Sequence, residues 1–185
     1  YLPEQVSAVV AVNPMNFSQQ GMSSFKKLHF TNDPCFTFRG KPLPYYPIGM
    51  TDMEFKKLVK QDARAHHEFM CLSEFYKKAV TSMPEDADYI IPAENTKGPI
   101  LLLSAGMDVM LPSEDICKRV MERLDKKGFK YPHKHIHYDI ASHYLCPAKP
   151  LTAKLFSAER KYPRECDASR EKAFEDTMNF LGKEW

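Results

Sequence analysis

The sequence predicts an α/β fold in which parallel strands are flanked by helices. Two unbroken apolar runs, Val6–Val12 and Gly98–Ser104, have the continuous hydrophobicity of strands that are covered on both faces. A helical pattern and then an alternating, strand-like segment follow the second run. Because strands and helices alternate in this way, we expect a parallel sheet joined by right-handed crossovers.

Length and composition are those of an ordinary globular protein. The chain has 185 residues, of which 43% are hydrophobic and 27% are charged. This length corresponds to one domain, or to one domain with a large insertion, and it can bury a sizeable core without disulfides or metal. The first residue is Tyr1 and a core strand follows almost at once, so we expect the C-terminal portion of a longer polypeptide.

Charge and cysteine content indicate which kinds of binding partner and which cellular compartment to expect. Lys and Arg number 26 against 24 Asp and Glu, a net charge of +2, which does not favour a nucleic-acid partner. The sequence has no run of about 20 apolar residues, so no membrane partner is expected either. No two cysteines have C-x-x-C spacing, which favours free thiols in a reducing compartment and a cytoplasmic protein. The five cysteines are Cys35, Cys71, Cys117, Cys146 and Cys166.

The residues between the two apolar runs are expected to form an insertion. Residues 15–50 have no clear period and contain many turn residues, which predicts a long irregular excursion. Thr51, with Glu54 three positions later, has the pattern of a capping box and predicts the start of a helix. A second helical stretch covers Ala65–Val80. We expect residues 13–95 to form a lid or insertion between two strands of the sheet.

The C-terminal half is predicted to contain two helices and one strand. The first helix has Ser113 as its N-cap and Gly128 directly after its end. His133–Ile140 alternates between apolar and polar residues, as an edge strand does. The last helix is capped by Asp167 or Ser169 and has an apolar stripe along one face.

Two side chains at predicted strand ends are candidates for acid–base chemistry. Asp108 follows the second apolar run, and His143 follows the next strand. In open α/β sheets ligands bind outside the carboxyl ends of the strands, where both residues are expected. Taken singly, Asp108 fits a turn cap equally well, and His143 fits a surface histidine better than a functional one. Together they fit an acid–base pair within hydrogen-bond reach, roughly 2.6–3.2 Å.

Three segments carry a resemblance to a known family. Ile91–Glu114, Leu124–Tyr144 and Arg39–Tyr45 resemble the C-terminal α/β-hydrolase domain of the acyl-CoA thioester hydrolases and bile acid-CoA:amino acid N-acyltransferases. The resemblance extends from about Tyr1 to the C-terminal helix and is closest to bacterial members. It implies that residues 1–185 are the C-terminal part of an α/β-hydrolase fold.

The resemblance also implies a function. The family has an acid and then a histidine after its Ser or Cys nucleophile, and by position Asp108 matches the acid and His143 the base. This implies an acyl-CoA thioester hydrolase of the Ser-Asp-His type, acting on acyl-CoA or a related thioester or ester without a cofactor. The alternatives are an acyl-CoA:amino acid N-acyltransferase and a non-catalytic binding module on the same fold.

The chain departs from the family in two ways. Near the acid and the base, four residues replace the family's usual Gly, second acid, Trp and Gly: Ala105, Met107, Leu111 and Ser142. More importantly, the sequence contains no G-x-S-x-G nucleophile elbow and no Cys form of it. We therefore expect no nucleophile in this chain and no activity from the chain by itself.

Other polar clusters are weaker candidates. His133, His135 and His137 share one face of the predicted strand, a pattern that suits a metal. A solvated edge strand is the interpretation that we favour, and no metal is expected. The lysine pairs are expected on solvated faces, and the sequence does not choose which of them, if any, contacts the phosphates of CoA. These pairs are Lys26–Lys27, Lys56–Lys57 and Lys126–Lys127.

The Val6–Val12 strand is expected to have an exposed pairing edge. The N–H and C=O groups of an unpaired apolar edge seek partners, which makes it a site of association. We expect self-association, or coverage by a missing N-terminal segment, at this edge.

Overall fold

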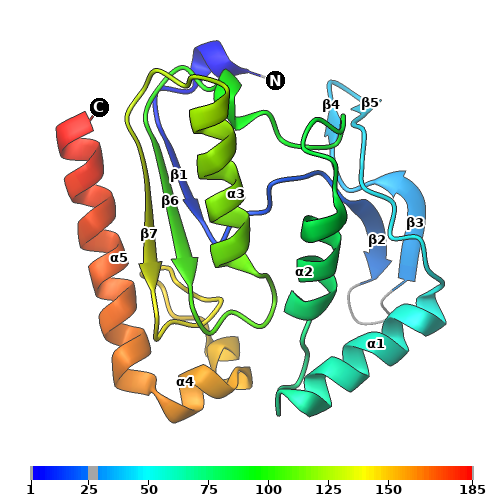
Figure 1. Ribbon diagram of the computed structural model, residues 1–185. Helices are drawn as coiled ribbons and strands as arrows, with labels where there is room; N and C mark the ends of the chain where they lie inside the picture. Colours follow the sequence, from blue (N-terminus) through cyan, green and yellow to red (C-terminus); the bar gives the residue numbers. More distant parts are fainter. Residues whose placement is uncertain (1, 25–28, 185) are drawn as a thin grey trace.

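The computed structural model describes residues 2–24 and 29–184. A parallel sheet with a helix on each face lies on one side of the molecule. The segment that connects the first two strands of this sheet folds into a second lobe beside it, built from two helices and short antiparallel strands (Figure 1). The predicted α/β fold is confirmed.

The sheet contains three parallel strands in the order β1 (Val9–Val12), β6 (Ile100–Ala105) and β7 (His133–Tyr138). Their register pairs Val9 with Ile100 at one end and Ala105 with Tyr138 at the other. All six residues of β6 are buried, because the strand has neighbours on both sides and helices over both faces. The unbroken hydrophobicity of this run therefore has the origin that the sequence suggested.

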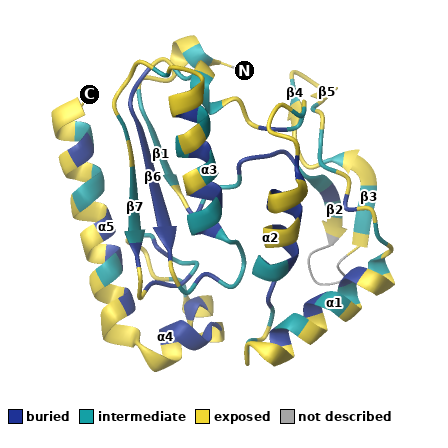
Figure 2. Cartoon of the chain, in the orientation of Figure 1, coloured by how far each residue is buried: buried dark blue, intermediate teal, exposed yellow. Residues whose placement is uncertain are grey.

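Alternate side chains of β6 pack into two separate cores. Ile100 and Leu102 face α3 (Ser113–Lys126) and cluster with the buried side chains of that helix: Cys117, Val120 and Leu124. Leu101, Leu103 and Ala105 face α5 (Pro163–Glu184) and cluster with Tyr138, Ala173 and Phe180. Figure 2 shows the buried β6 between the half-exposed helices. Packing of α3 and α5 on opposite faces of the sheet therefore fixes the carboxyl ends of its strands.

The second lobe has a core of its own. It contains β2 (Gln20–Ser24) paired with β3 (His29–Pro34), β4 (Thr37–Phe38) paired with β5 (Lys41–Pro42), α1 (Asp52–Ala65) and α2 (Ser73–Ser82). Its aromatic side chains pack edge to face, with Phe55 between Phe30 and Phe75. Ile116 of α3 joins the same cluster, so α3 belongs to both lobes. Short helices complete the chain: η1 (Pro3–Gln5), η2 (Ala93–Asn95), η3 (Leu151–Leu155) and α4 (Ser157–Lys161).

The predicted capping box at the start of α1 is confirmed. The Glu54 amide donates to Thr51 Oγ1 at 3.3 Å, and the Thr51 amide donates to Glu54 Oε2 at 2.8 Å. Two backbone amides at the helix start thereby gain hydrogen-bond partners.

Several predicted boundaries in the first half of the chain are wrong for identifiable reasons. The first strand begins at Val9 and not at Val6, which is the C-cap of the short helix η1 and donates its amide to the Pro3 carbonyl. Residues 15–50 are less irregular than expected, since they contain the β2–β3 and β4–β5 pairs. The stretch Ala65–Val80 is not one helix: α1 ends at Ala65, the chain turns at His67 with a φ of 55°, and α2 begins at Ser73.

Two predicted caps in the second half are also wrong. Ser113 is the first helical residue of α3 and not its N-cap, since its hydroxyl group donates to the Ala105 carbonyl at 3.3 Å. The last helix begins at Pro163, ahead of the predicted caps Asp167 and Ser169. Proline is well suited to the first helical position because its missing N–H would be unpaired there.

Candidate functional site

Asp108 and His143 meet at the carboxyl ends of β6 and β7. Each follows its strand by a few residues, and the His143 Nδ1 atom lies 3.0 Å from both carboxylate oxygens of Asp108. The predicted hydrogen-bond contact is confirmed. The catalytic roles of the two residues stay predictions.

The carboxylate of Asp108 is fixed from two directions. Its Oδ1 atom accepts hydrogen bonds from the amides of Met110 at 2.8 Å and Leu111 at 3.1 Å. The side chain is 1% exposed, against 30% for that of His143. Asp108 therefore caps a turn and contacts the imidazole at the same time, so the two interpretations of this residue are compatible.

This geometry determines the tautomer of His143. An ionised carboxylate only accepts hydrogen bonds, so the proton of the neutral imidazole resides on Nδ1. The lone pair is then on Nε2, and the described residues supply no hydrogen-bond partner to that atom. A partly exposed imidazole with a free Nε2 is able to accept a proton from a group that lies within hydrogen-bond reach of that atom.

Gly106 lets the two loops approach each other. Its amide donates to the Tyr138 carbonyl at 2.9 Å, and the next amide, of Met107, donates to the Ala141 carbonyl at 3.0 Å. A Cβ atom at Gly106 would lie 2.5 Å from the backbone oxygen of Asp139, much closer than real Cβ contacts. A side chain there would push apart the two strand ends that carry Asp108 and His143.

A buried ion pair lies behind His143. The Ser142 hydroxyl group donates to Glu159 Oε1 at 2.5 Å, and Arg170 donates to the same oxygen at 2.6 Å and to the Tyr144 carbonyl at 3.3 Å. Burial opposes the ionisation of Glu159, but the hydrogen bonds from Arg170 and Ser142 outweigh it and keep the pKa of Glu159 below its usual value. Ser142, one of the departures from the family, therefore anchors the histidine loop.

The second lobe reaches the site through two side chains. Both carboxylate oxygens of Glu68 accept from the Ser157 amide, at 3.1 and 3.0 Å. Phe69 packs edge to face on Phe156, with ring centroids 5.3 Å apart, and the Phe156 ring lies 6.4 Å from that of His143.

A cavity of about 240 Å³ opens beside Asp108 and is also lined by Ser73 and Glu74 from α2.

β7 is an edge strand of the described sheet, as predicted, but its three histidines are only partly exposed and contact neighbouring side chains. Ser104 Oγ lies 2.7 Å from Nε2 of His135 and 2.9 Å from Nδ1 of His137. His133 Nε2 lies 2.9 Å from a carboxylate oxygen of Asp125. Within the described ranges, no group of three or more His, Cys, Asp and Glu side chains has an arrangement that could hold a metal ion.

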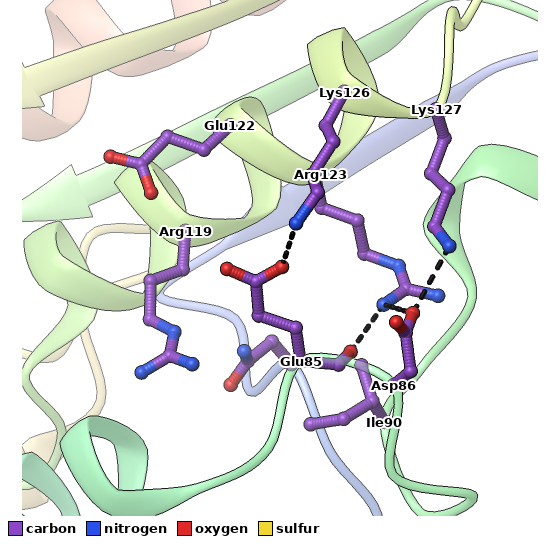
Figure 3. Close-up of a pocket in the computed structure, with 9 residues that line it drawn as sticks. Glu85, Asp86, Ile90, Arg119, Glu122, Arg123, Lys126 and Lys127 are labelled. Atoms are coloured by element: carbon purple, nitrogen blue, oxygen red, sulfur yellow. Dashed lines mark hydrogen bonds and ion pairs between the residues drawn. The ribbon is translucent and has the colours of Figure 1, made fainter.

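The charged pocket in Figure 3 lies at the far end of α3 from the dyad. It has a volume of about 280 Å³ and a lining rich in both charges. Three of its four cations are paired with acids: Arg123 with Glu94 at 2.6 Å, Lys127 with Asp86 at 3.0 Å, and Lys126 with Glu85; the fourth, Arg119, donates to backbone carbonyl groups. These pairs attach residues 85–94 to the helix, and each ammonium group of the Lys126–Lys127 pair contacts an acidic side chain. The Lys26–Lys27 pair lies outside the described residues.

Sequence reasoning missed the groups that hold the dyad in place. Arg170 lies on the buried face of α5 together with Cys166 and Ala173. An arginine on an apolar stripe was the available signal for a buried ion pair. Asn13, directly after the first strand, carried no such signal.

Fold and site together define the class of protein. A parallel sheet flanked by helices, with an acid and a histidine in contact at neighbouring strand ends, is the arrangement of an α/β-hydrolase-like domain. The family model described as "BAAT / Acyl-CoA thioester hydrolase C terminal" matches residues 1–184, so the chain belongs to this family. The predicted family is thus confirmed, whereas the bacterial source stays a prediction.

A search of curated proteins found no match. In the described part of the chain, no helix has the length and apolar character needed to cross a bilayer.

We predict that Gly106→Ala destabilises the protein by about 1–3 kcal/mol, the usual cost of forcing extra atoms into a packed site. The expected cause is the contact with the Asp139 backbone. Urea unfolding followed by circular dichroism measures the free energy of unfolding. Gly182→Ala is the matched control, because no atom lies within 4 Å of the added Cβ and alanine favours the helix. Equal stability of the two variants would contradict the prediction.

We also predict opposite pH effects from two neighbouring histidines. Burial and the nearby His137 lower the pKa of His135 from its ordinary 6.5. The unfolded state therefore takes up this proton first, and stability is lost as pH falls below about 6.5. His133 has a raised pKa, owing to the Tyr131 carbonyl and then Asp125, so its stabilisation is present below 6.5 and lost as pH rises through the folded-state pKa.

Urea unfolding at pH 5.5 and 7.5 tests this pair. His135→Gln is expected to lose less stability on acidification than the unchanged protein does. His133→Gln is expected to lose more. The same change in both variants would contradict the assignment of the two environments.

Proposed function

We propose that Asp108 and His143 are the acid and the base of an acyl-CoA thioester hydrolase of the Ser-Asp-His type, and that the nucleophile is not among these 185 residues. The observation that carries the proposal is the 3.0 Å contact between His143 Nδ1 and Asp108, which leaves Nε2 directed away from the acid. Family membership supports acyl-CoA thioesters as the substrate class. The lack of a G-x-S-x-G elbow in the sequence supports the second part.

The proposed reaction uses His143 twice. Nε2 takes the proton of the nucleophile as that group attacks the thioester carbonyl, and it later gives the proton to the departing thiolate of CoA. Asp108 keeps the Nδ1–H tautomer and stabilises the imidazolium between the two transfers. A water molecule, activated by the same Nε2 atom, then releases the acyl group.

The family description leaves the acyl acceptor open between water and an amine. In a hydrolase water attacks the acyl-enzyme, and in an N-acyltransferase the amine of an amino acid does. The chemistry asked of Asp108 and His143 is the same in both reactions. A non-catalytic binding module is the third candidate, but it would not require the buried acid and the histidine to meet.

We propose that residues 1–185 are the C-terminal part of an α/β-hydrolase domain and that residues 13–95 form its lid, inserted between two strands of the sheet. The contacts of Glu68 with Ser157 and of Phe69 with Phe156 support this, because they attach the second lobe beside His143.

A cytoplasmic location is proposed as well. It is supported by five free cysteines, of which Cys35 is exposed.

We predict that the 185-residue chain releases thiol from acyl-CoA only at the uncatalysed rate, and that His143→Ala and Asp108→Asn leave this rate unchanged. A thiol-reactive dye measures the release, and added amino acid with mass spectrometry of the product detects acyl transfer. In the protein extended upstream of Tyr1 through its nucleophile, each variant is expected to lower kcat by roughly 10³-fold or more.

Two outcomes would contradict the proposal. Sustained thiol release by the 185-residue chain that His143→Ala abolishes would mean that the chain holds its own nucleophile. Catalysis by the extended protein that survives both substitutions would remove Asp108 and His143 from the reaction.

We further propose that the free edge of β1 leads to self-association. Within residues 2–24 and 29–184, β1 pairs only with β6, and Val12 is 39% exposed. We predict a weight-average mass above that of a monomer in sedimentation experiments, rising with protein concentration. Val10→Pro, which removes a backbone donor from this strand, is expected to lower the association. A monomer at high concentration would contradict the proposal.

A further inference from the structure

Asn13 is the first residue after β1 and is buried, with 6% of its surface exposed. Its backbone has a φ of 45°, in the left-handed region. Residues with a side chain rarely adopt this region, and asparagine is among the few that tolerate it. The strain is located at the same edge of the sheet as Asp108 and His143, and backbone strain of this kind gathers at functional sites.

The contacts of Asn13 join all three strand ends. Its backbone amide donates to the Leu103 carbonyl at 2.8 Å. Its side-chain Oδ1 accepts from the Ala105 amide at 3.0 Å, and its Nδ2 donates to the carbonyl of His143 at 2.9 Å. One side chain therefore connects the end of β6, three residues before Asp108, with the backbone of the histidine itself.

The histidine loop is thereby held on two sides. Glu159 and Arg170 hold Ser142 and Tyr144 from the side of α4 and α5. Asn13 holds the residue between them from the side of β1. The contacts of Glu159 and Arg170 fix the loop to the helices. The contacts of Asn13 fix the separation between the His143 backbone and the end of the strand that precedes Asp108.

We propose that Asn13 is a positioning residue for the Asp108–His143 pair: its side-chain amide sets the distance between the two loops and so keeps His143 in the Nδ1–H tautomer. The amide satisfies both contacts at once, because its NH2 group donates to the His143 carbonyl and its oxygen accepts from the Ala105 amide. The catalytic value of this arrangement rests on the proposed function. The tautomer itself does not, because it is measured without any substrate.

Three variants separate the parts played by the amide. Asn13→Asp keeps the shape and tolerates the left-handed backbone, but it turns the donor facing the His143 carbonyl into an acceptor. Asn13→Gly keeps the backbone conformation and removes both side-chain contacts. Asn95→Asp adds the same charge at an exposed position and is the matched control.

The test is nitrogen-15 NMR of the histidine side chains of the 185-residue chain at a pH where His143 is neutral. Its resonances are assigned by their loss in His143→Gln. In the unchanged protein and in Asn95→Asp we expect the Nδ1–H tautomer, with a slowly exchanging low-field proton on Nδ1. We expect Asn13→Asp and Asn13→Gly to lose that proton signal and to mix the two tautomers, and we expect the same of Asp108→Asn.

A second measurement needs no variant. Hydrogen exchange of the Asn13 side-chain amide is expected to be much slower than that of the exposed Asn95 amide. Exchange of Asn13 as fast as that of Asn95 would overturn the proposal, and so would a wild-type tautomer and low-field signal in folded Asn13→Asp or Asn13→Gly. If the tautomer depends on Asn13 but the extended protein hydrolyses no thioester, the positioning role stands and the proposed function falls.

Discussion

The parallel pairing of β6 with β1 and β7 is the constraint on which the site depends. In parallel strands the carboxyl ends lie at one edge of the sheet, so residues that follow them meet without further folding. β6 is buried on both faces by α3 and α5, which prevents it from sliding against its neighbours. A shift in register would separate Asp108 from His143 and also detach Asn13 from both loops.

Charge is used inside this domain to fix loops. Glu159 and Arg170 are both buried, and each has a second partner of opposite charge: Lys149 lies 3.2 Å from Glu159, and Arg170 also pairs with Asp167. Such pairs are expensive to bury, and replacing both partners by apolar groups often stabilises a protein. Their geometry here suggests a different use, since the pair contacts the two residues that flank His143 and so limits the positions of that loop.

α3 ties the two lobes together. Ile116 packs in the core of the second lobe, while Cys117, one residue later, packs on the sheet. Farther along the helix, Arg119 donates to the carbonyl groups of Val80 and Met83, and Arg123 binds Glu94. The same helix starts beside Asp108, so the second lobe is held in a defined position relative to the dyad. The contact between Glu68 and Ser157 closes the connection on the other side.

The sequence by itself determined the strands of the sheet, the helices that cover them and the two residues at the strand ends. Continuous hydrophobicity, capping residues and strand order are local or one-dimensional signals, and they sufficed to predict that Asp108 and His143 approach each other. Only the tertiary structure decided what holds them there. Asn13, Glu159 and Arg170 act on residues 11 to 130 positions away, through hydrogen bonds that produce no periodic pattern in the sequence. The boundaries of α2 and the packing of the three histidines were decided in the same way, by burial against elements distant in the chain.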